Sequence, residues 1–204
     1  MIVLIDEGHG GIKDGVYQTK GKKQYHFTDK NESVYEGELN REYGERLHEM
    51  VKKYADVIRV AHEYKDTPLA DRVAIANAIH KVQPCIYISL HNNAASAGIK
   101  GFGSKATGTE VITSAGQTKS DVLAENVIRG IREEMPNRVI RMDKRDGDMD
   151  KEMLLYVLEK TTCPAILVEV GFFDNWDEVL RIYDPKFIDR VCKGIATGIY
   201  KFIK

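Results

Sequence analysis

The sequence predicts a single α/β domain built on a twisted, mostly parallel sheet of about six strands with helices on both faces. The chain has 204 residues, 43% of them hydrophobic and 30% charged, which is typical of one globular domain. Short β-rich runs alternate along it with segments of helical periodicity. This alternation favours a parallel sheet, because the crossover helices cover both of its faces.

The strands are expected where short apolar runs rich in β-branched residues occur. These runs span residues 2–6, 57–61, 85–90, 109–113, 138–142 and 165–170. The last run, AILVEV, is apolar on both side-chain parities except for Glu169, which is typical of a central strand.

The helices are expected where apolar residues recur every three or four positions. Leu39, Tyr43 and Leu47 begin one such stripe, which continues to Tyr54. Similar stripes cover residues 69–79, 123–131 and 188–202. Residues 12–35 and 92–108 lack a sustained period and are expected to be long loops, which are often functional.

Charge and cysteine content exclude several classes of function. The formal net charge is −1, so the sequence offers no electrostatic case for binding nucleic acid or an anionic membrane. No apolar stretch approaches the roughly 18 residues of a spanning helix. The N-terminus, MIVLIDEGHGG, has no basic segment, so we expect no export signal and synthesis in the cytoplasm. The three cysteines form no CxxC pair and are expected to be buried thiols.

Polar residues that follow the predicted strands are candidates for chemistry, because ligands of open α/β sheets bind beyond the carboxyl ends of the strands. His9 follows the first strand, His91 follows the third, and Glu169 lies near the end of the last. Glu36 lies in the first turn of the first predicted helix. Two histidines and a glutamate from separate elements would bind Zn²⁺ and leave its fourth position open to water. A further carboxylate could then transfer protons.

Each of these residues also has a purely structural interpretation. A histidine beside glycine often lies in a surface turn, which applies to His9, and His91 fits a polar strand end. An acidic residue such as Glu36 in a first helical turn interacts favourably with the helix dipole. Glu169 differs, because a carboxylate inside an apolar strand is costly to bury unless it is paired or bound to a metal.

The ordered set of motifs resembles a known enzyme family. DEGHGG, an ExxxN helix start, LADRVAIAN, ISLHNNA, GTEV and PAILVEVGFFDN follow one another along the chain. In this order they resemble the zinc-dependent N-acetylmuramoyl-L-alanine amidases often called amidase 3, which occur in bacterial cell-wall hydrolases and phage endolysins. The resemblance extends from Ile2 to the last predicted helix.

The resemblance implies a set of site residues. His9 and His91 match the zinc-binding histidines, and Glu169 matches the catalytic carboxylate. Glu36 matches the zinc-binding glutamate, because an Asn, a small residue and a Leu follow at the family's spacing. Glu38 is the alternative ligand, although it breaks that spacing.

Two positions depart from the family pattern. Glu7 replaces the usual proline of the first motif, a change expected to alter the turn more than the metal site. Glu159 stands where the family often has a basic residue, which puts any substrate contact there in doubt.

The implied reaction is hydrolysis of the amide between the lactyl group of N-acetylmuramic acid and L-alanine in peptidoglycan, with Zn²⁺ as cofactor and peptidoglycan or a muropeptide as substrate. Asn92 and Asn93 are expected to bind substrate, and Asp6 to support the site. No acyl-enzyme is needed, so Ser89 has no nucleophilic role. Aromatic residues after Glu169 either line a substrate groove or pack in the core: Phe172, Phe173 and Trp176.

Two other functions stay open. The same metal chemistry in a zinc peptidase would cut within the stem peptide, and an inert muropeptide-binding module would keep the fold without turnover. We expect residues 1–204 to form the zinc amidase catalytic domain of a monomer, with no separate wall-binding domain. We also expect the protein to reach the cell wall after release by a separate lysis protein.

Overall fold

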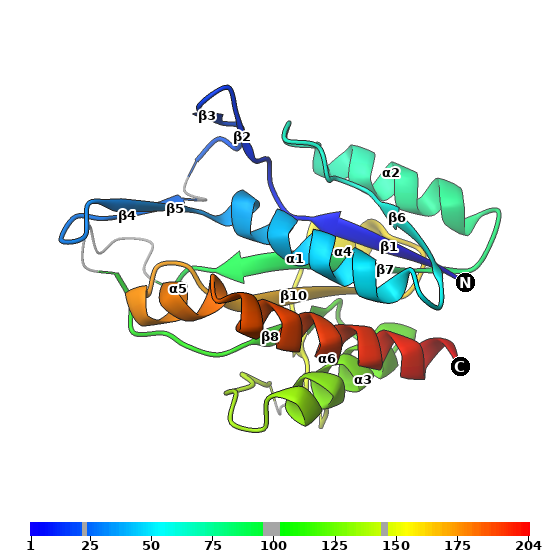
Figure 1. Cartoon of the computed structure of the whole chain (residues 1–204). Helices are drawn as coiled ribbons and strands as arrows, with labels where there is room; N and C mark the ends of the chain where they lie inside the picture. Colours follow the sequence, from blue (N-terminus) through cyan, green and yellow to red (C-terminus); the bar gives the residue numbers. More distant parts are fainter. Residues whose placement is uncertain (22–23, 96–102, 144–146) are drawn as a thin grey trace.

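The computed structural model describes residues 1–21, 24–95, 103–143 and 147–204. Its core is a six-stranded sheet, which runs through the centre of the molecule between helices (Figure 1). The strand order is β6-β1-β7-β10-β8-β9. All neighbours run parallel except β8 and β10, which confirms the predicted mostly parallel sheet. The strands are β1 (Ile2–Glu7), β6 (Asp56–Arg59), β7 (Cys85–Asn93), β8 (Glu110–Thr113), β9 (Lys151–Glu152) and β10 (Ala165–Phe172).

Helices cover both faces of the sheet, as predicted. One face packs against α1 (Glu36–Val51), α3 (Lys119–Glu134), α5 (Trp176–Ile182) and α6 (Pro185–Ile203). The other packs against α2 (Leu69–His80) and the short α4 (Tyr156–Lys160). The two faces have separate apolar cores because successive strand residues point to opposite sides. The periodic stripes predicted α1, α2, α3 and α6, whereas α4 and α5 are too short to produce a stripe.

The prediction of a strand at residues 138–142 is wrong. In that segment only the isolated bridge between Thr109 and Ile140 forms, and the sixth strand is β9. The physical reason is Arg138, whose guanidinium turns inward to the buried carboxylate of Glu178 (2.7 Å) and to the Val170 carbonyl (2.8 Å). These contacts fix Arg138, and the segment meets Thr109 through a single bridge without forming a regular strand.

The two predicted loops contain more order than their composition indicates. Residues 12–35 include two hairpins, β2 (Ile12–Lys13) with β3 (Val16–Tyr17) and β4 (Gln24–Phe27) with β5 (Glu32–Tyr35). Strands of two to four residues are too short for periodicity to reveal. In the second loop, β7 continues to Asn93, and residues 96–102 lie outside the described residues.

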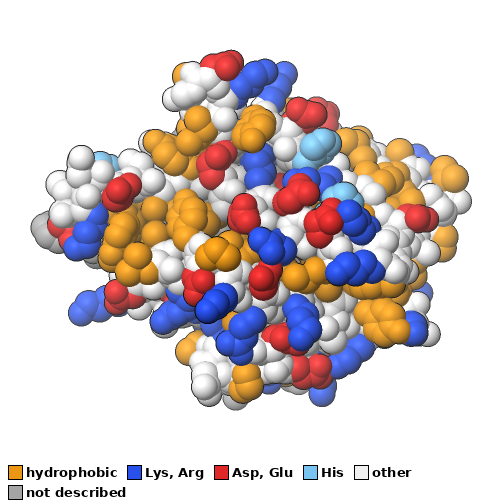
Figure 2. Space-filling model, in the orientation of Figure 1, with side chains coloured by type: hydrophobic (Ala, Val, Ile, Leu, Met, Phe, Trp, Pro, Cys, Tyr) orange, Lys and Arg blue, Asp and Glu red, His pale blue; other side chains and the backbone are white. Residues whose placement is uncertain are grey.

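The cysteines and the surface charges are placed as the sequence predicted, with buried thiols and no excess of one charge. All three cysteines are free and buried. Figure 2 shows Lys and Arg interspersed with Asp and Glu over the face that carries α1 and α6. None of the helices in the described ranges is both long and apolar enough to span a membrane.

Candidate metal and catalytic site

A row of polar residues crosses the sheet where its parallel strands end. Glu169 of β10 has His91 of β7 as its Cα partner on one side and Glu110 of β8 on the other. Residues paired in this way project from the same face of a sheet. That face is the one covered by α2 and α4, because its core contains Tyr87, four residues before His91, and Leu167, two residues before Glu169. Between these helices a cavity reaches the strand ends, because Leu69 of α2, Val157 of α4 and His91 all line it.

The turn after β1 brings His9 beside this row. The Gly8 N–H donates to the Leu90 carbonyl (3.0 Å), which extends the pairing of β1 with β7 by one residue. A Cβ on Gly8 would lie 2.2 Å from Cε1 of His91, so only glycine leaves room for that ring. His9 itself has φ 67°, in the left-handed region that non-glycine residues seldom adopt. This strained backbone turns the His9 ring toward His91, and the ring centroids lie 4.9 Å apart.

Glu36 joins the two histidines from the first position of α1. Gly37 lets the helix approach the turn this closely, because a Cβ at that position would lie only 1.8 Å from the Gly10 carbonyl oxygen. Oε2 of Glu36 is 3.2 Å from Nε2 of His9, and Oε1 is 2.9 Å from Nδ1 of His91. The side chain of Glu36 is 2% exposed, and the two imidazoles are 17% and 16% exposed. His9, Glu36 and His91 therefore lie together as the sequence predicted.

The electrostatics of this group suit a cation. Burial opposes ionisation of Glu36, but the hydrogen bonds from His9 and His91 outweigh it and hold the pKa of the carboxyl well below its usual range. Burial likewise opposes protonation of His91, but Glu36 and the charge of Glu169 raise the pKa of the imidazole. The three donor atoms lie within 4.8 Å of one another and can hold a metal ion. Two imidazole nitrogens and one carboxylate oxygen form a donor set that fits Zn²⁺.

Glu38, the alternative ligand, has a different place in the structure. Its Oε1 accepts a hydrogen bond from the backbone N–H of Ile12 (2.7 Å). A Cβ on Gly11 would lie 2.5 Å from the same oxygen. Glu38 thus supports the start of the first hairpin, and it is not one of the donors grouped with His9 and His91.

A buried ion pair that was not predicted from the sequence lies beside the site. Arg72 of α2 is 2% exposed, and its Nη1 lies 2.5 Å from Oδ1 of Asp6 and 2.8 Å from the Glu7 carbonyl. Ser89 donates to Oδ2 of Asp6 (2.8 Å), so the hydroxyl has a structural partner. The sequence feature that could have indicated this pair is Arg72 itself, three positions after Leu69 and beside the apolar stripe of its helix. Asp6 and Arg72 tie β1 to α2, and both line the same cavity as the two histidines.

Glu7, the departure from the family pattern, points away from the metal group. It is fully buried on the α1 side of β1, where its Oε1 accepts from Nε of Arg59 (2.6 Å). A Cβ on Gly44 would lie 2.4 Å from Oε1 of Glu7, so the small residue in α1 makes room for it. Burial raises the pKa of the Glu7 carboxyl, although Arg59 acts against this. The substitution is therefore accommodated by an ion pair outside the site.

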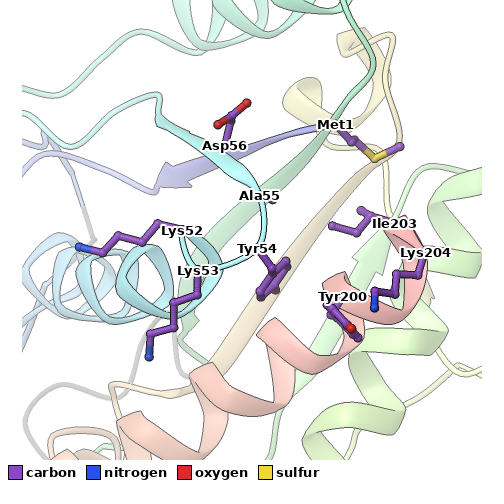
Figure 3. Close-up of a pocket in the computed structure, with 9 residues that line it drawn as sticks. All are labelled: Met1, Lys52, Lys53, Tyr54, Ala55, Asp56, Tyr200, Ile203 and Lys204. Atoms are coloured by element: carbon purple, nitrogen blue, oxygen red, sulfur yellow. The ribbon is translucent and has the colours of Figure 1, made fainter.

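A cavity of about 520 Å³ opens beside the histidines on the α2 side of the sheet. Its walls come from the strand ends, the first hairpin, the start of α2 and α4: Asp6, Gly8, His9, Gln18, Thr19, Lys20, Asp66, Thr67, Pro68, Leu69, Arg72, His91 and Val157. A larger hollow of about 780 Å³ lies near both chain ends (Figure 3). Its lining includes Lys52, Lys53 and Tyr200 but none of the metal-group residues.

The two asparagines predicted to bind substrate make contacts within the protein. Asn92 is 2% exposed, and its amide donates to Oδ1 of Asn40 (3.0 Å). The Asn93 amide donates to Oε2 of Glu110 (3.4 Å). Its Oδ1 accepts from the backbone N–H of Ala94 (2.7 Å). Asn93 is half-buried, whereas Asn92 faces α1 through its contact with Asn40.

The aromatic residues after Glu169 pack mainly in the interior. Phe172 and Phe173 are each 2% exposed. Trp176 is half-buried and meets Phe27 edge to face, with centroids 5.0 Å apart. Glu159 is exposed on α4.

The remaining histidines lie apart from the metal group. His26 and His62 are exposed, and His48 and His80 lie half-buried on α1 and α2. His26 shares a hydrogen bond with Ser33 across the β4–β5 hairpin (2.9 Å). We assign none of the four a catalytic role.

Comparisons with known proteins place this chain in a family. Residues 3–201 match the Amidase_3 family, described as N-acetylmuramoyl-L-alanine amidase. The chain is 29% identical over 203 residues to an endolysin of Bacillus phage SPP1, covering 99% of this chain and 66% of the endolysin. It is 28% identical over 212 residues to an uncharacterized cell wall amidase of Bacillus anthracis, covering 98% of this chain but only 35% of that protein.

A solved structure agrees with the sequence match. The N-acetylmuramoyl-L-alanine amidase from Clostridium difficile 630 superimposes with a TM-score of 0.78 at 27% identity, covering 99% of this chain and 96% of that one. The family match spans nearly the whole chain and the fold agrees over the same length. The chain therefore belongs to the Amidase_3 family of N-acetylmuramoyl-L-alanine amidases.

Proposed function

We propose that this protein is a zinc-dependent N-acetylmuramoyl-L-alanine amidase in which His9, Glu36 and His91 hold the metal. The observation that carries the proposal is that three segments far apart in sequence bring two imidazoles and one buried carboxylate within 4.8 Å. A bound Zn²⁺ would lower the pKa of a water molecule and polarise the scissile carbonyl. The apolar core of the domain does not include His9, Glu36 or His91. Loss of zinc should therefore abolish activity without unfolding the domain.

Glu169 is proposed as the proton-transfer residue. It is the register partner of His91 on the α2 side of the sheet, and its charge acts on the His91 imidazole. From this position a carboxylate takes the proton of the attacking water and delivers it to the departing amine of L-alanine. Ser89 takes no part, because its hydroxyl is buried against Asp6.

The substrate is proposed to be peptidoglycan or a muropeptide, bound across the strand ends. The cavity beside His9 and His91 has a mixed lining, with Leu69 and Val157 as apolar walls and Thr19 and Lys20 as polar ones. Such a lining suits a sugar or a peptide. Of the two asparagines, the half-buried Asn93 is proposed to contact substrate, since Asn92 is 2% exposed. We propose that a monomer acts on the wall, with the three ligands His9, Glu36 and His91 supplied by this chain, and that residues 1–204 are its catalytic domain.

The test is product analysis on purified peptidoglycan. The parent protein should release glycan with intact lactyl groups and stem peptides with free L-alanine N-termini, and a chelator should stop the reaction. Cleavage within the stem peptide would instead identify a zinc peptidase. Binding of muropeptides without any cleavage would identify an inert module.

The role of Glu169 is tested by Glu169→Gln, which keeps the size of the side chain but removes the base. Turnover should fall by roughly a hundred- to ten-thousand-fold while zinc content and unfolding temperature stay near those of the parent. Turnover within a few-fold of the parent would refute proton transfer by Glu169. Loss of zinc from this variant would make it a ligand.

A further inference from the structure

One buried amide, that of Asn40, contacts the segments that carry the proposed metal ligands. Asn40 is fully buried on α1, and it follows Glu36 by four positions, so the two side chains lie on one face of the helix. Its Nδ2 donates to the Gly8 carbonyl (2.9 Å), next to His9. Its Oδ1 accepts from the amide of Asn92 (3.0 Å), next to His91.

The contacts close into a loop around the metal group. The backbone N–H of Asn92 donates to Oε1 of Glu36 (3.3 Å), the oxygen that also meets His91. The backbone N–H of Gly8 donates to the Leu90 carbonyl (3.0 Å), one residue before His91. Each ligand-bearing segment is therefore bonded to the next, and Asn40 joins the β1 turn to the end of β7.

The chemistry of asparagine suits this position. The amide offers a donor and an acceptor on one planar group, and here each has a buried partner. Aspartate has the same shape but would place a carboxylate oxygen against the Gly8 carbonyl oxygen, and leucine would leave both partners without their hydrogen bonds.

We propose that Asn40 is the positioning residue of the metal site, setting the spacing of His9 and His91 through Gly8 and Asn92. This inference rests on the proposed zinc ligands. The side chain of Asn40 is not a ligand in this scheme. It acts on zinc affinity by fixing the backbone that carries both imidazoles.

The experiment measures the zinc dissociation constant of metal-free protein by competition with a chromophoric chelator, and unfolding by urea in the absence of metal. Asn40→Asp should weaken zinc binding by about 10- to 100-fold, the usual cost of losing an outer partner of a ligand. Tyr43→Phe is the matched control, because it removes another buried hydrogen bond of α1, to the Ile182 carbonyl (2.8 Å), away from the site. It should lower the urea midpoint but leave zinc affinity within twofold.

A second variant keeps the inference testable if Asn40→Asp unfolds. Asn92→Ala breaks the same chain of contacts and should also weaken zinc binding. Where both single variants fold, the double variant should bind zinc only slightly more weakly than the single variant with the lower zinc affinity, because the two residues act in one network. Zinc affinity within twofold of the parent in either folded variant would overturn the inference, as would a loss in Tyr43→Phe equal to that in Asn40→Asp. A parent protein that binds no zinc would refute the proposed function instead.

Discussion

Substitution of Gly8 by alanine tests the geometry of the metal group most directly. The added Cβ would lie 2.2, 2.3 and 2.6 Å from Cε1, Nε2 and Nδ1 of His91. Ordinary contacts begin at 3.4 Å, so the ring would have to move by about 1 Å or more. The ring cannot make that movement and keep its hydrogen bond to Glu36 (2.9 Å).

The displacement is large on the scale of metal coordination. Zinc–nitrogen bonds are about 2.0–2.1 Å long, and the distances of a well-formed zinc site lie within about 0.2 Å of such values. We therefore expect Gly8→Ala to weaken zinc binding at least about 100-fold, or about 2.7 kcal/mol. Overpacking should also lower the free energy of unfolding by about 1–3 kcal/mol.

The assay compares zinc affinity, unfolding and peptidoglycan cleavage in Gly8→Ala and in Gly44→Ala. The control adds a Cβ 2.4 Å from Oε1 of Glu7, on the opposite side of β1 from the metal group. It should lose stability and keep its zinc. The reasoning fails if Gly8→Ala binds zinc within threefold of the parent, or if Gly44→Ala loses zinc to the same extent.

Two further predictions use single carboxylates. Glu36→Ala should lose zinc while Glu38→Ala retains it, because Glu38 accepts a hydrogen bond from the Ile12 N–H and is not in the metal group. Zinc content is measured by elemental analysis, and the reverse pattern would make Glu38 the ligand. Burial, reinforced by the charges of Asp148 and Asp121, raises the pKa of Asp150 to about 6. The folded state therefore holds this proton to a higher pH than the unfolded state does, and the free energy of unfolding declines as the pH rises from about 4 to 6. Asp150→Asn removes that penalty and should raise the unfolding temperature by about 5 °C at pH 7.5 but not at pH 4, and an equal shift at both values would show that ionisation is not the cause.

Local patterns were sufficient for much of the fold. The four long helices and five of the six expected strands form where periodicity and β-rich runs predicted them, because each pattern reports which face of one element is buried. The placement of His9, His91 and Glu169 at strand ends followed from the same information. Parallel strands bring their carboxyl ends to one edge, so polar residues at those ends must meet.

Pairings between distant segments were decided only by the tertiary structure. The periodicity that predicts α1 does not show that Glu36 faces the histidines while Glu38 bonds the first hairpin. Arg138 occupies a segment with strand propensity, yet Glu178, 40 residues later, draws it out of the sheet. The buried pairs of Arg72 with Asp6 and of Arg59 with Glu7 join residues more than 50 positions apart. A buried polar group is stable only with a partner, and that partner is chosen by packing in space, which no local pattern records.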